Sequence, residues 1–389
     1  MFGEKQYLQL PGPTPVPPRV LRALSEPMIN HRGAEFRELL EEVTAGVKWS
    51  FQTENEVFIF PAAGTGGMEA AVVNFISPGE KVLAVSIGVF GNRFAEIAGR
   101  FGARVEKLEF DWGTAADPEK IGQRLAEDEK REIKAVLITH NETSTGVTND
   151  LPAVRRAMGN HPALLIVDAV SSLGAMDLRT DEWGLDVVVT GAQKAFMLPP
   201  GLTMLSVSPR AWEAAQQCTN AKYYWDLGAA RKYQEKGQTP YTPALPLLTG
   251  LRESLKMMRQ EGLTGSFDRH ARMRDMTRAA MRALGLELLC EDAVASAAVT
   301  AVRSPAGLEA NRLRRVAREN YNVVLAGGQQ KLDNVIFRLG HLGWVQPLDI
   351  IAAIAAVEMA LLDCGVPVPL GAGVTKAQEM LRAEREGTK

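Results

Sequence analysis

The sequence lacks the closely spaced cysteines, the excess of positive charge and the long apolar runs that mark disulfide-rich, nucleic-acid-binding and membrane-spanning proteins. Its three cysteines, Cys218, Cys290 and Cys364, lie far apart and form no CxxC pair, so they predict neither a disulfide framework nor a cysteine metal site. The net charge of −2 gives no sign of a basic surface for nucleic acid or anionic membrane. No apolar run approaches the roughly 20 residues that span a bilayer. The first six residues also lack a basic-then-apolar signal, so we expect a cytoplasmic protein.

Two common kinds of catalytic motif are also missing. The five histidines form no HxH or HExxH spacing, and with the scattered cysteines they predict no metal site. The sequence contains no GxSxG segment, which would mark the nucleophile of many hydrolases. Any catalytic chemistry must therefore come from other residues.

The sequence does contain short apolar segments alternating with helical stretches. Several segments are apolar almost throughout, as in strands covered on both faces by helices. This alternation predicts an α/β fold with a mostly parallel seven-stranded sheet flanked by helices. The expected strands are Val57–Phe60, Lys81–Val85, Val105–Leu108, Ala135–Thr139, Leu164–Val167, Val187–Thr190 and Thr203–Val207.

Three parts are expected along the chain. Residues 1–35 are rich in proline, which lacks the backbone donor of a helix or sheet interior, and predict an extended N-terminal arm. Residues 36–260 carry the seven expected strands and form the large domain. Residues 261–389 alternate helices with further apolar segments and predict a smaller C-terminal α/β domain.

Lys194 and Asp168 are the most informative pair of residues. Each closes or follows an apolar strand, and in a parallel sheet the carboxyl ends of strands meet at the ligand crevice. An amine there can form a Schiff base with the aldehyde of pyridoxal 5′-phosphate, and a carboxylate can hold the protonated ring nitrogen. The pair therefore predicts a pyridoxal phosphate enzyme with Lys194 as the proton carrier.

A glycine-rich turn, Gly64-Thr65-Gly66-Gly67, opens an apolar helix after the first expected strand. Glycines let backbone N–H groups approach an anion, and a helix N-terminus favours negative charge. A dinucleotide site would need an acidic residue at the end of the next strand, Val82–Ser86, which has none. The turn therefore favours a single phosphate over a nicotinamide cofactor.

Taken together, these motifs resemble those of class V aminotransferases of pyridoxal phosphate fold type I, closest to the alanine–glyoxylate and serine–glyoxylate (serine–pyruvate) group. The resemblance covers nearly the whole chain. Its most specific segments are the Gly-Thr-Gly-Gly turn, His140–Gly146, Val167–Ser172, Gly191–Lys194 and Pro199-Pro200-Gly201.

The resemblance implies a role for each matching residue. Lys194 and Asp168 would be catalytic, and Arg338, with Gly12 nearby, would bind the substrate and grip its carboxylate. Thr242 and Tyr241 would reach the phosphate of the neighbouring subunit in a homodimer. The remaining cofactor-binding positions are Thr65, Gly66, Gly67, Phe90, Thr143, Val170 and Gln193, with Phe90 and Val170 on opposite ring faces.

We therefore expect a transaminase that moves an amino group from alanine or serine to glyoxylate or pyruvate by a ping-pong mechanism. One plausible carboxylate-binding arginine favours small monocarboxylic substrates. Ureidoglycine–glyoxylate transamination is the alternative with the same machinery. A class V lyase or cysteine desulfurase is a weaker alternative, because no cysteine has the setting of a mobile nucleophile and Gln193 replaces the usual histidine before the lysine.

Overall fold

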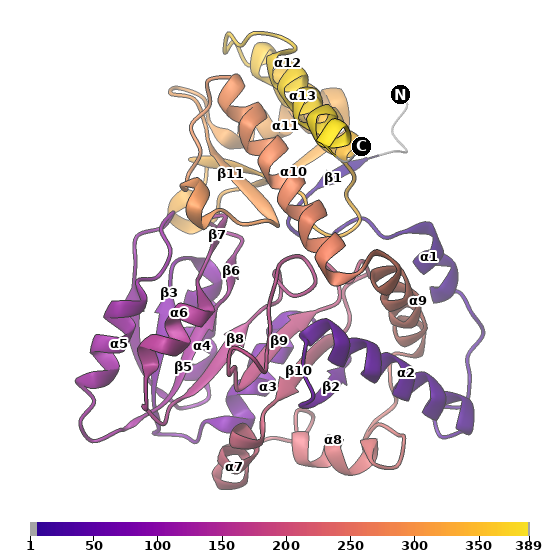
Figure 1. Cartoon of the computed structure of the whole chain (residues 1–389), viewed down its shortest axis with the longest axis vertical. Coiled ribbons are helices and arrows are strands. Elements are labelled where there is room, and N and C mark those ends of the chain that lie inside the picture. The colour runs from indigo at the N-terminus through magenta and orange to yellow at the C-terminus, as the bar shows by residue number, and fades with distance from the viewer. Residues whose placement is uncertain (1–5, 388–389) are drawn as a thin grey trace.

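The structure is a computed structural model that describes residues 6–387. The first five residues, on which much of the expectation about a signal segment rests, lie outside this range, as do residues 388–389. Figure 1 shows a large helix-flanked sheet below and a smaller sheet with the C-terminal helices above. Within the described residues, no helix is long and apolar enough to cross a membrane.

The large sheet has seven strands, as predicted. Neighbouring strands β9, β8, β5, β3 and β4 all pair in parallel, whereas β10 runs antiparallel to both β2 and β9. The sheet order is β2-β10-β9-β8-β5-β3-β4, with strands β2 (Glu56–Phe60), β3 (Lys81–Ser86), β4 (Arg104–Glu109), β5 (Ile133–Thr139), β8 (Leu164–Asp168), β9 (Val187–Gly191) and β10 (Thr203–Val207).

Helices cover both faces of this sheet, which is why its central strands are apolar in nearly every position. Residues of β8 and β9 are buried throughout, and two separate hydrophobic clusters lie on the two faces. The helices of this part are α2 (Ala34–Phe51), α3 (Gly64–Phe75), α4 (Val89–Arg100), α5 (Pro118–Ala126), α6 (Leu151–Met158), α7 (Pro209–Gln217), α8 (Leu227–Gln234) and α9 (Leu245–Glu261).

The smaller part is built on a four-stranded sheet with the order β1-β12-β13-β11. A third hydrophobic cluster fills the space between this sheet and the C-terminal helices. Its elements are α10 (Leu263–Ala283), β11 (Val299–Arg303), α11 (Ala310–Tyr321), β12 (Val323–Gly327), β13 (Ile336–Gly340), α12 (Pro347–Asp363) and α13 (Ala372–Gly387), with single 3-10 turns at Asp292–Val294 and Gln330–Leu332.

The N-terminal segment differs from the expected extended arm. Strand β1 (Tyr7–Gln9) pairs in parallel with β12 of the small sheet, and α1 (Pro18–Leu24) is a helix. Proline in the first turn is compatible with a helix because the missing N–H has no intrahelical partner there. The stretch between these two elements, which holds Pro11, Pro13, Pro15 and Pro17, lacks regular structure, as do residues 25–33 after α1.

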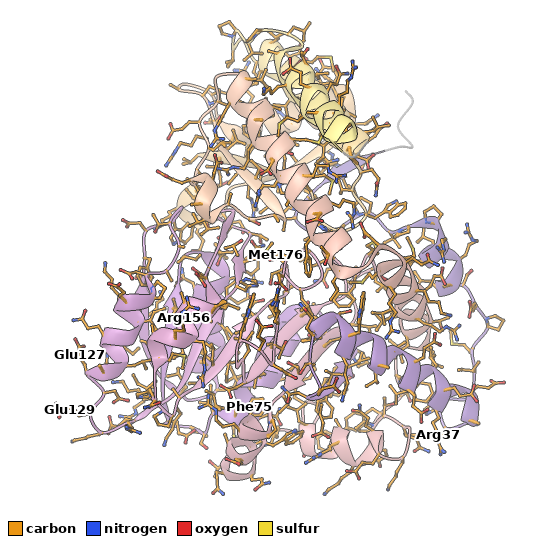
Figure 2. The ribbon with its side chains drawn as sticks, viewed as in Figure 1. Arg37, Phe75, Glu127, Glu129, Arg156 and Met176 are labelled. Carbon is orange, nitrogen blue, oxygen red and sulfur yellow. The ribbon has the colours of Figure 1, made fainter. Side chains whose placement is uncertain are left out.

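The two parts meet along a small apolar contact. Ala175 and Ala195 of the large part pack with Ala298 and Leu342 of the small part, and Met176 packs against the group. Figure 2 shows Met176 at this junction, whereas Glu127, Glu129 and Arg156 lie at the outer surface. This contact places the loop after β13 next to Lys194.

Candidate active site

A cavity of about 160 Å³ lies at the carboxyl ends of the parallel strands. The segments that follow β2, β5, β8 and β9 all reach it, as the strand arrangement requires. Its walls are Ala63, Gly64, Thr65, Met68, Phe90, Arg93, Asn141, Thr143, Asp168, Val170, Ser171, Gln193 and Lys194. Seven of the predicted site residues are therefore brought together here.

Lys194 follows β9 and extends its amine into this wall. Its Nζ donates a hydrogen bond to the carbonyl oxygen of Pro11 at 2.5 Å. Burial lowers the pKa of the ammonium to about 8, against the opposing effect of Asp168, while the positive charges of Arg338 and Arg93 lower it further. A substantial fraction of the amine is neutral just above neutral pH, which suits it to nucleophilic attack and proton transfer.

Gly12 makes room for this lysine. A Cβ at Gly12 would lie 2.4 Å from Cδ and 2.6 Å from Nζ of Lys194, and its φ of +115° disfavours any side chain. Thr14 fixes the same stretch, because its Oγ1 donates to the carbonyl of Lys194 at 3.1 Å. The N-terminal segment is thus part of the lysine's surroundings. The structure shows Gly12 against Lys194 and shows no contact of Gly12 with Arg338.

Asp168 ends β8 on the opposite wall. The N–H of Val170 donates to Oδ1 at 2.9 Å, and the hydroxyl of Thr139 lies 3.5 Å from Oδ2. Burial raises the pKa of the carboxyl to about 6, while these hydrogen bonds and the charges of Lys194 and Arg93 oppose the rise. At neutral pH the side chain is mostly an oriented carboxylate facing the cavity.

Helices α3 and α4 both begin at this edge of the sheet, and they differ in whether a side chain accepts hydrogen bonds from their first N–H groups. The N–H groups of Phe90 and Gly91 at the start of α4 donate to the fully buried carboxylate of Glu142, at 2.8 and 3.1 Å. The start of α3 has no such partner: Ala63 makes no side-chain cap, and no acidic residue lies in the first turn. Helix α3 therefore leaves its positive end for an anion from outside the chain.

The glycines of the turn serve different purposes. A Cβ at Gly64 would lie 2.5 Å from Val170, which lines the cavity. A Cβ built on Gly67 would lie 2.2 Å from the hydroxyl oxygen of Thr203 in β10, and a Cβ built on Gly66 would lie 2.9 Å from the ring of Trp225. The missing side chains of Gly66 and Gly67 thus allow α3 to pack closely, and Gly64 and Thr65 form the wall of the cavity.

Gln193 lies beside the start of α3. A Cβ built on Gly191 would be 2.9 Å from Gln193 Oε1 and 3.3 Å from the N of Gly64, so the amide and the helix end are close. This Oε1 is buried and has no hydrogen-bond partner. An orphaned polar atom beside an uncapped helix end fits a site built for a polar group that the chain itself does not supply.

Arg338 lies in β13, behind Thr143. Its Nε donates to the carbonyl of Gly327 at 2.8 Å and its NH1 to that of Thr143 at 2.6 Å. The side chain is buried, and burial lowers its pKa to about 10 despite the opposing charge of Glu142. In the described chain it has no ion-pair partner. A buried guanidinium without a carboxylate partner is a strong anion site.

Tyr241 and Thr242 are not brought to this cavity. They line a separate pocket between α2, β2 and α8, where Tyr241 stacks on Tyr224 with ring centroids 5.3 Å apart. Three aromatic side chains on this face are exposed: Tyr223, Tyr224 and Tyr233. Within one copy of the chain these residues line no part of the cavity that holds Lys194.

The residues that the sequence reasoning missed are Arg93, Glu142, Asn141 and Ser171. Arg93 lies one turn after Phe90 on α4, and this i, i+3 spacing was the available signal. Asn141 and Ser171 hold the two loops together, since the Nδ2 of Asn141 donates to the Oγ of Ser171 at 2.9 Å.

Comparison with known families decides the identity of this site. The family described as "Aminotransferase class-V" matches residues 6–342. The chain belongs to the class V aminotransferases. The enzyme has the fold of pyridoxal phosphate fold type I, and pyridoxal phosphate is its cofactor.

Relatives match over nearly the whole chain. An L-aspartate–glyoxylate aminotransferase of Paracoccus denitrificans is 42% identical, covering 96% of this chain and 95% of its own. A serine–glyoxylate aminotransferase of Methylorubrum extorquens is 41% identical, covering 97% and 96%. The crystal structure of ureidoglycine–glyoxylate aminotransferase from Bacillus subtilis superposes with a TM-score of 0.92 at 29% identity, covering 98% of this chain and 99% of that one.

One relative carries a different kind of name. A protein of Anabaena cylindrica, named as the 42 kDa subunit of a soluble hydrogenase, is 48% identical over 97% of this chain and 98% of its own. In this enzyme all three cysteines are free. No group of three or more histidine, cysteine, aspartate or glutamate side chains within residues 6–387 could hold a metal ion.

The cavity fits pyridoxal phosphate at each of its functional groups. The uncapped start of α3 with Thr65 suits the phosphate, and Asp168 suits a protonated ring nitrogen. Lys194 supplies the amine, and Phe90 and Val170 offer apolar surfaces on the wall. The chemistry of this set of side chains therefore agrees with the family's cofactor.

Proposed function

We propose that this aminotransferase moves an amino group from alanine or serine to glyoxylate or pyruvate in two half-reactions at one site. The observation that carries the proposal is the position of Arg338. Its buried guanidinium has no carboxylate partner in the described chain, and its charge acts on Lys194. A planar guanidinium can bind one carboxylate through two parallel hydrogen bonds. Small monocarboxylic substrates match this single oriented cation.

Lys194 and Asp168 then perform separate tasks. Pyridoxal phosphate, when bound, supplies an aldehyde that condenses with amines and a ring that accepts the electron pair released at the substrate Cα. Asp168 keeps a negative charge opposite Lys194, and the N–H of Val170 fixes its direction. Lys194 Nζ would take the proton from the substrate Cα and deliver it to the carbon that carried the cofactor's aldehyde, and in the second half-reaction it would move a proton in the reverse direction, to the Cα of the acceptor. Arg338 would hold the carboxylate of donor and acceptor alike, so the first product must leave before the acceptor binds, as a ping-pong reaction requires.

A screen of single half-reactions tests this proposal. The purified enzyme is mixed with one amino acid at a time, and the absorbance of the bound cofactor and the 2-oxo acid product are followed. Alanine and serine are expected to convert the cofactor faster than aspartate or ureidoglycine. A faster reaction with ureidoglycine would replace the proposal with its main alternative, for which the Bacillus subtilis structure is the nearest support. No cysteine lines the cavity, which argues against desulfurase chemistry.

Replacing Arg338 by glutamine should raise the KM for alanine about 100-fold, because breaking a buried charged pair typically costs about 2–5 kcal/mol. Lysine at this position should give an intermediate KM, since it keeps the charge and loses the planar fork. Steady-state kinetics with alanine measures both changes.

Ethylamine, which has no carboxylate, provides the matched control for Arg338. Its slow reaction with the bound cofactor should change less than twofold in the glutamine variant. A KM for alanine that stays within twofold of the unmodified enzyme would show that the carboxylate binds elsewhere.

We further propose a homodimer in which Thr242 of each chain completes the phosphate site of the other. The support is that Tyr241 and Thr242 lie on a face with exposed aromatic side chains, away from their own chain's Lys194. Mixing a Lys194→Ala protein with a Thr242→Ala protein should restore activity at limiting cofactor, because one site of each mixed dimer is then intact. Sedimentation velocity should give twice the chain mass of 42.3 kDa. No recovery from a demonstrated mixed dimer would contradict the shared site.

A further inference from the structure

We propose that Arg93 is the side-chain cation of the phosphate site, an inference that deepens the proposed function. Arg93 lies in α4 and lines the cavity. Its NH1 is 3.5 Å from the hydroxyl of Thr65 at the start of α3, and its guanidinium lies 4.7 Å from the centroid of the Phe90 ring. It thus lies between the helix end that suits an anion and the ring expected to stack on the cofactor.

Arg93 has no carboxylate partner of its own. Within residues 6–387 it forms no ion pair: its guanidinium contacts the Thr65 hydroxyl and the Phe90 ring, and its charge acts on Asp168 and Lys194 across the cavity. On the same helix, Arg100 is paired with Glu96. A cation that lines a cavity without an acidic partner is placed to meet an anion from outside.

The two neighbouring helix ends show where that anion would bind. Glu142 already satisfies the N–H groups of Phe90 and Gly91, so the start of α4 is filled by the chain's own charge. The start of α3 has neither a side-chain cap nor an acidic residue. A phosphate there would meet backbone donors, the Thr65 hydroxyl and the guanidinium of Arg93, which together offset its double negative charge.

The position of Arg93 argues against the other anion that could use it, the second carboxylate of a dicarboxylic donor. Arg338, which is expected to hold the α-carboxylate, is bonded to the carbonyl of Thr143. Arg93 is bonded instead to Thr65, in the turn at the start of α3. We therefore assign it to the cofactor phosphate and not to the substrate side chain.

Equilibrium dialysis of the enzyme against pyridoxal phosphate and against pyridoxal, which lacks the phosphate, tests this assignment. Replacing Arg93 by glutamine should raise the Kd for pyridoxal phosphate about tenfold and that for pyridoxal less than twofold. Arg93→Lys should fall between these values, because it keeps the charge without the fork.

Arg100→Gln is the matched control. It removes an equal charge from the same helix, at a side chain that is 80% exposed and outside the cavity. It should leave both dissociation constants unchanged. If Arg93→Gln weakened the binding of pyridoxal phosphate and of pyridoxal equally, the inference would be overturned, since Arg93 would then act on the pyridine ring that both ligands share and not on the phosphate. An unchanged Kd with a raised KM for aspartate alone would overturn it in favour of a substrate role.

Failure of the proposed function can be told apart from failure of this inference. If the unmodified enzyme binds pyridoxal phosphate and transaminates, the comparison of the Kd values for pyridoxal phosphate and pyridoxal tests only the role of Arg93. If the unmodified enzyme converts no amino acid, the proposed donors are wrong, and the dialysis still measures the role of Arg93.

Discussion

Replacing Lys194 by alanine is expected to lower the rate of transamination about 1,000-fold or more. General base catalysis alone contributes about 100- to 10,000-fold, and the variant also loses the only amine in the cavity wall. The binding contacts at Thr65, Asp168 and Arg338 remain, so the variant should still take up the cofactor. Stopped-flow absorbance with alanine measures the half-reaction.

Two further measurements separate chemistry from structure at this position. Lys194→Arg keeps a cation near the Pro11 carbonyl but cannot give up its proton near neutral pH, so it should be as inactive as the alanine variant. Methylamine added to the alanine variant should restore part of the rate by acting as a free base in the space left by the side chain. Turnover of the alanine variant at the rate of the unmodified enzyme would refute the role assigned to Lys194.

Unfolding at low pH is the second large effect that we expect. Three fully buried histidines are held neutral, because burial lowers the pKa of His140 to about 4 and those of His270 and His341 to about 3. Arg274 and Arg278 lower the pKa of His341 further, Arg269 lowers that of His270, and Asp150 and Asp177 act in the opposite direction on His140.

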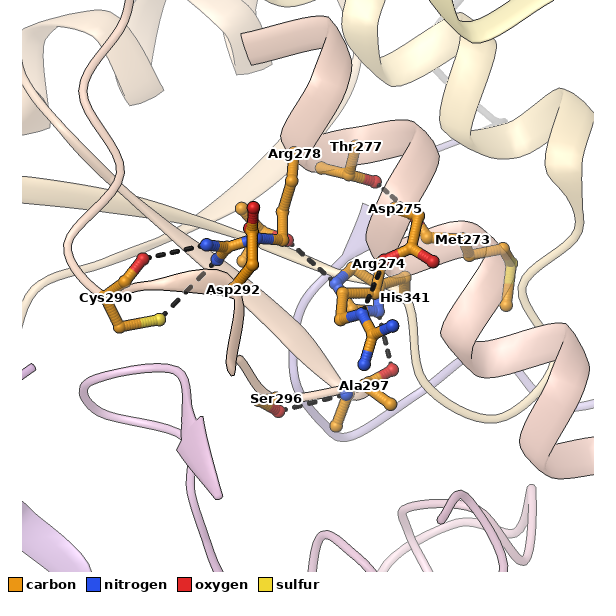
Figure 3. A network of polar contacts seen from close by, with 12 residues as sticks. Met273, Arg274, Asp275, Thr277, Arg278, Cys290, Asp292, Ser296, Ala297 and His341 are labelled. Atoms are coloured by element: carbon orange, nitrogen blue, oxygen red, sulfur yellow. Dashed lines mark hydrogen bonds and ion pairs between the residues drawn. The ribbon is translucent and has the colours of Figure 1, made fainter. Parts of the chain in front are cut away.

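The hydrogen bonds of His270 require its neutral form, and those of His341 are compatible with it. His341 Nδ1 bonds the carbonyl of Ala297 at 2.8 Å, as Figure 3 shows, and its Nε2 lies 3.0 Å from the Thr300 hydroxyl. The Nε2 of His270 accepts from the N–H of Gly343 at 3.0 Å, which leaves Nδ1 to donate to the Ser266 carbonyl at 2.7 Å. A protonated His270 could not accept from Gly343, which is beside Lys194.

The sign of the effect follows from these directions. In the unfolded chain the histidines become protonated below a pH of about 6.5, whereas in the folded chain they stay neutral down to a pH of about 3–4. The folded state is therefore not destabilised by these rings above pH of about 6.5, and its free energy of unfolding falls as the pH drops below that value. At pH 5, each of the three histidine rings lowers the free energy of unfolding by about 2 kcal/mol. Asp168, whose pKa is raised to about 6, has the opposite effect: its protonation raises the free energy of unfolding by about 1 kcal/mol as the pH falls to 5. Together these four groups lower the free energy of unfolding by about 5 kcal/mol between pH 7.5 and 5, and Glu142, whose pKa burial also raises, opposes this loss in the same direction as Asp168.

Urea unfolding of the enzyme with its cofactor at pH 7.5, 6 and 5 measures this loss. His140→Asn should reduce the pH dependence by about two fifths, since it removes one ring's contribution of about 2 kcal/mol and leaves the hydrogen bonds of the other two rings in place. His31→Asn, a change in a histidine outside these buried positions, should leave the dependence unchanged. A free energy of unfolding that stays constant down to pH 5 would contradict the prediction.

The fold could be predicted from the sequence wherever a segment is uniformly apolar. All seven strands of the large sheet were predicted to within two residues at each end, because helices on both faces leave a clear apolar signal. The antiparallel direction of β10 and the pairing of β1 with β12 were not predicted. Both depend on partners far away in the sequence, and local periodicity carries no information about them.

The candidate site was predictable where a residue follows a strand. Lys194, Asp168, Thr65 and Thr143 all follow strands of the large sheet and line the cavity. Arg93 was missed because it lies inside a helix, where an arginine is usually a surface residue. Glu142 was missed because its role is to fill the end of α4, which only the packing of two loops reveals. The catalytic and binding roles of these residues stay predictions until the variants are measured.

The pairing of β1 with β12 has a consequence for how the enzyme matures during synthesis. Tyr7 lies opposite Val323, so the strand pairing that anchors the N-terminal end of the segment with Pro11 and Gly12 cannot form until more than 300 further residues have left the ribosome. Because domains generally fold in order as they emerge, the seven-stranded sheet can form first, and the surroundings of the lysine are completed last.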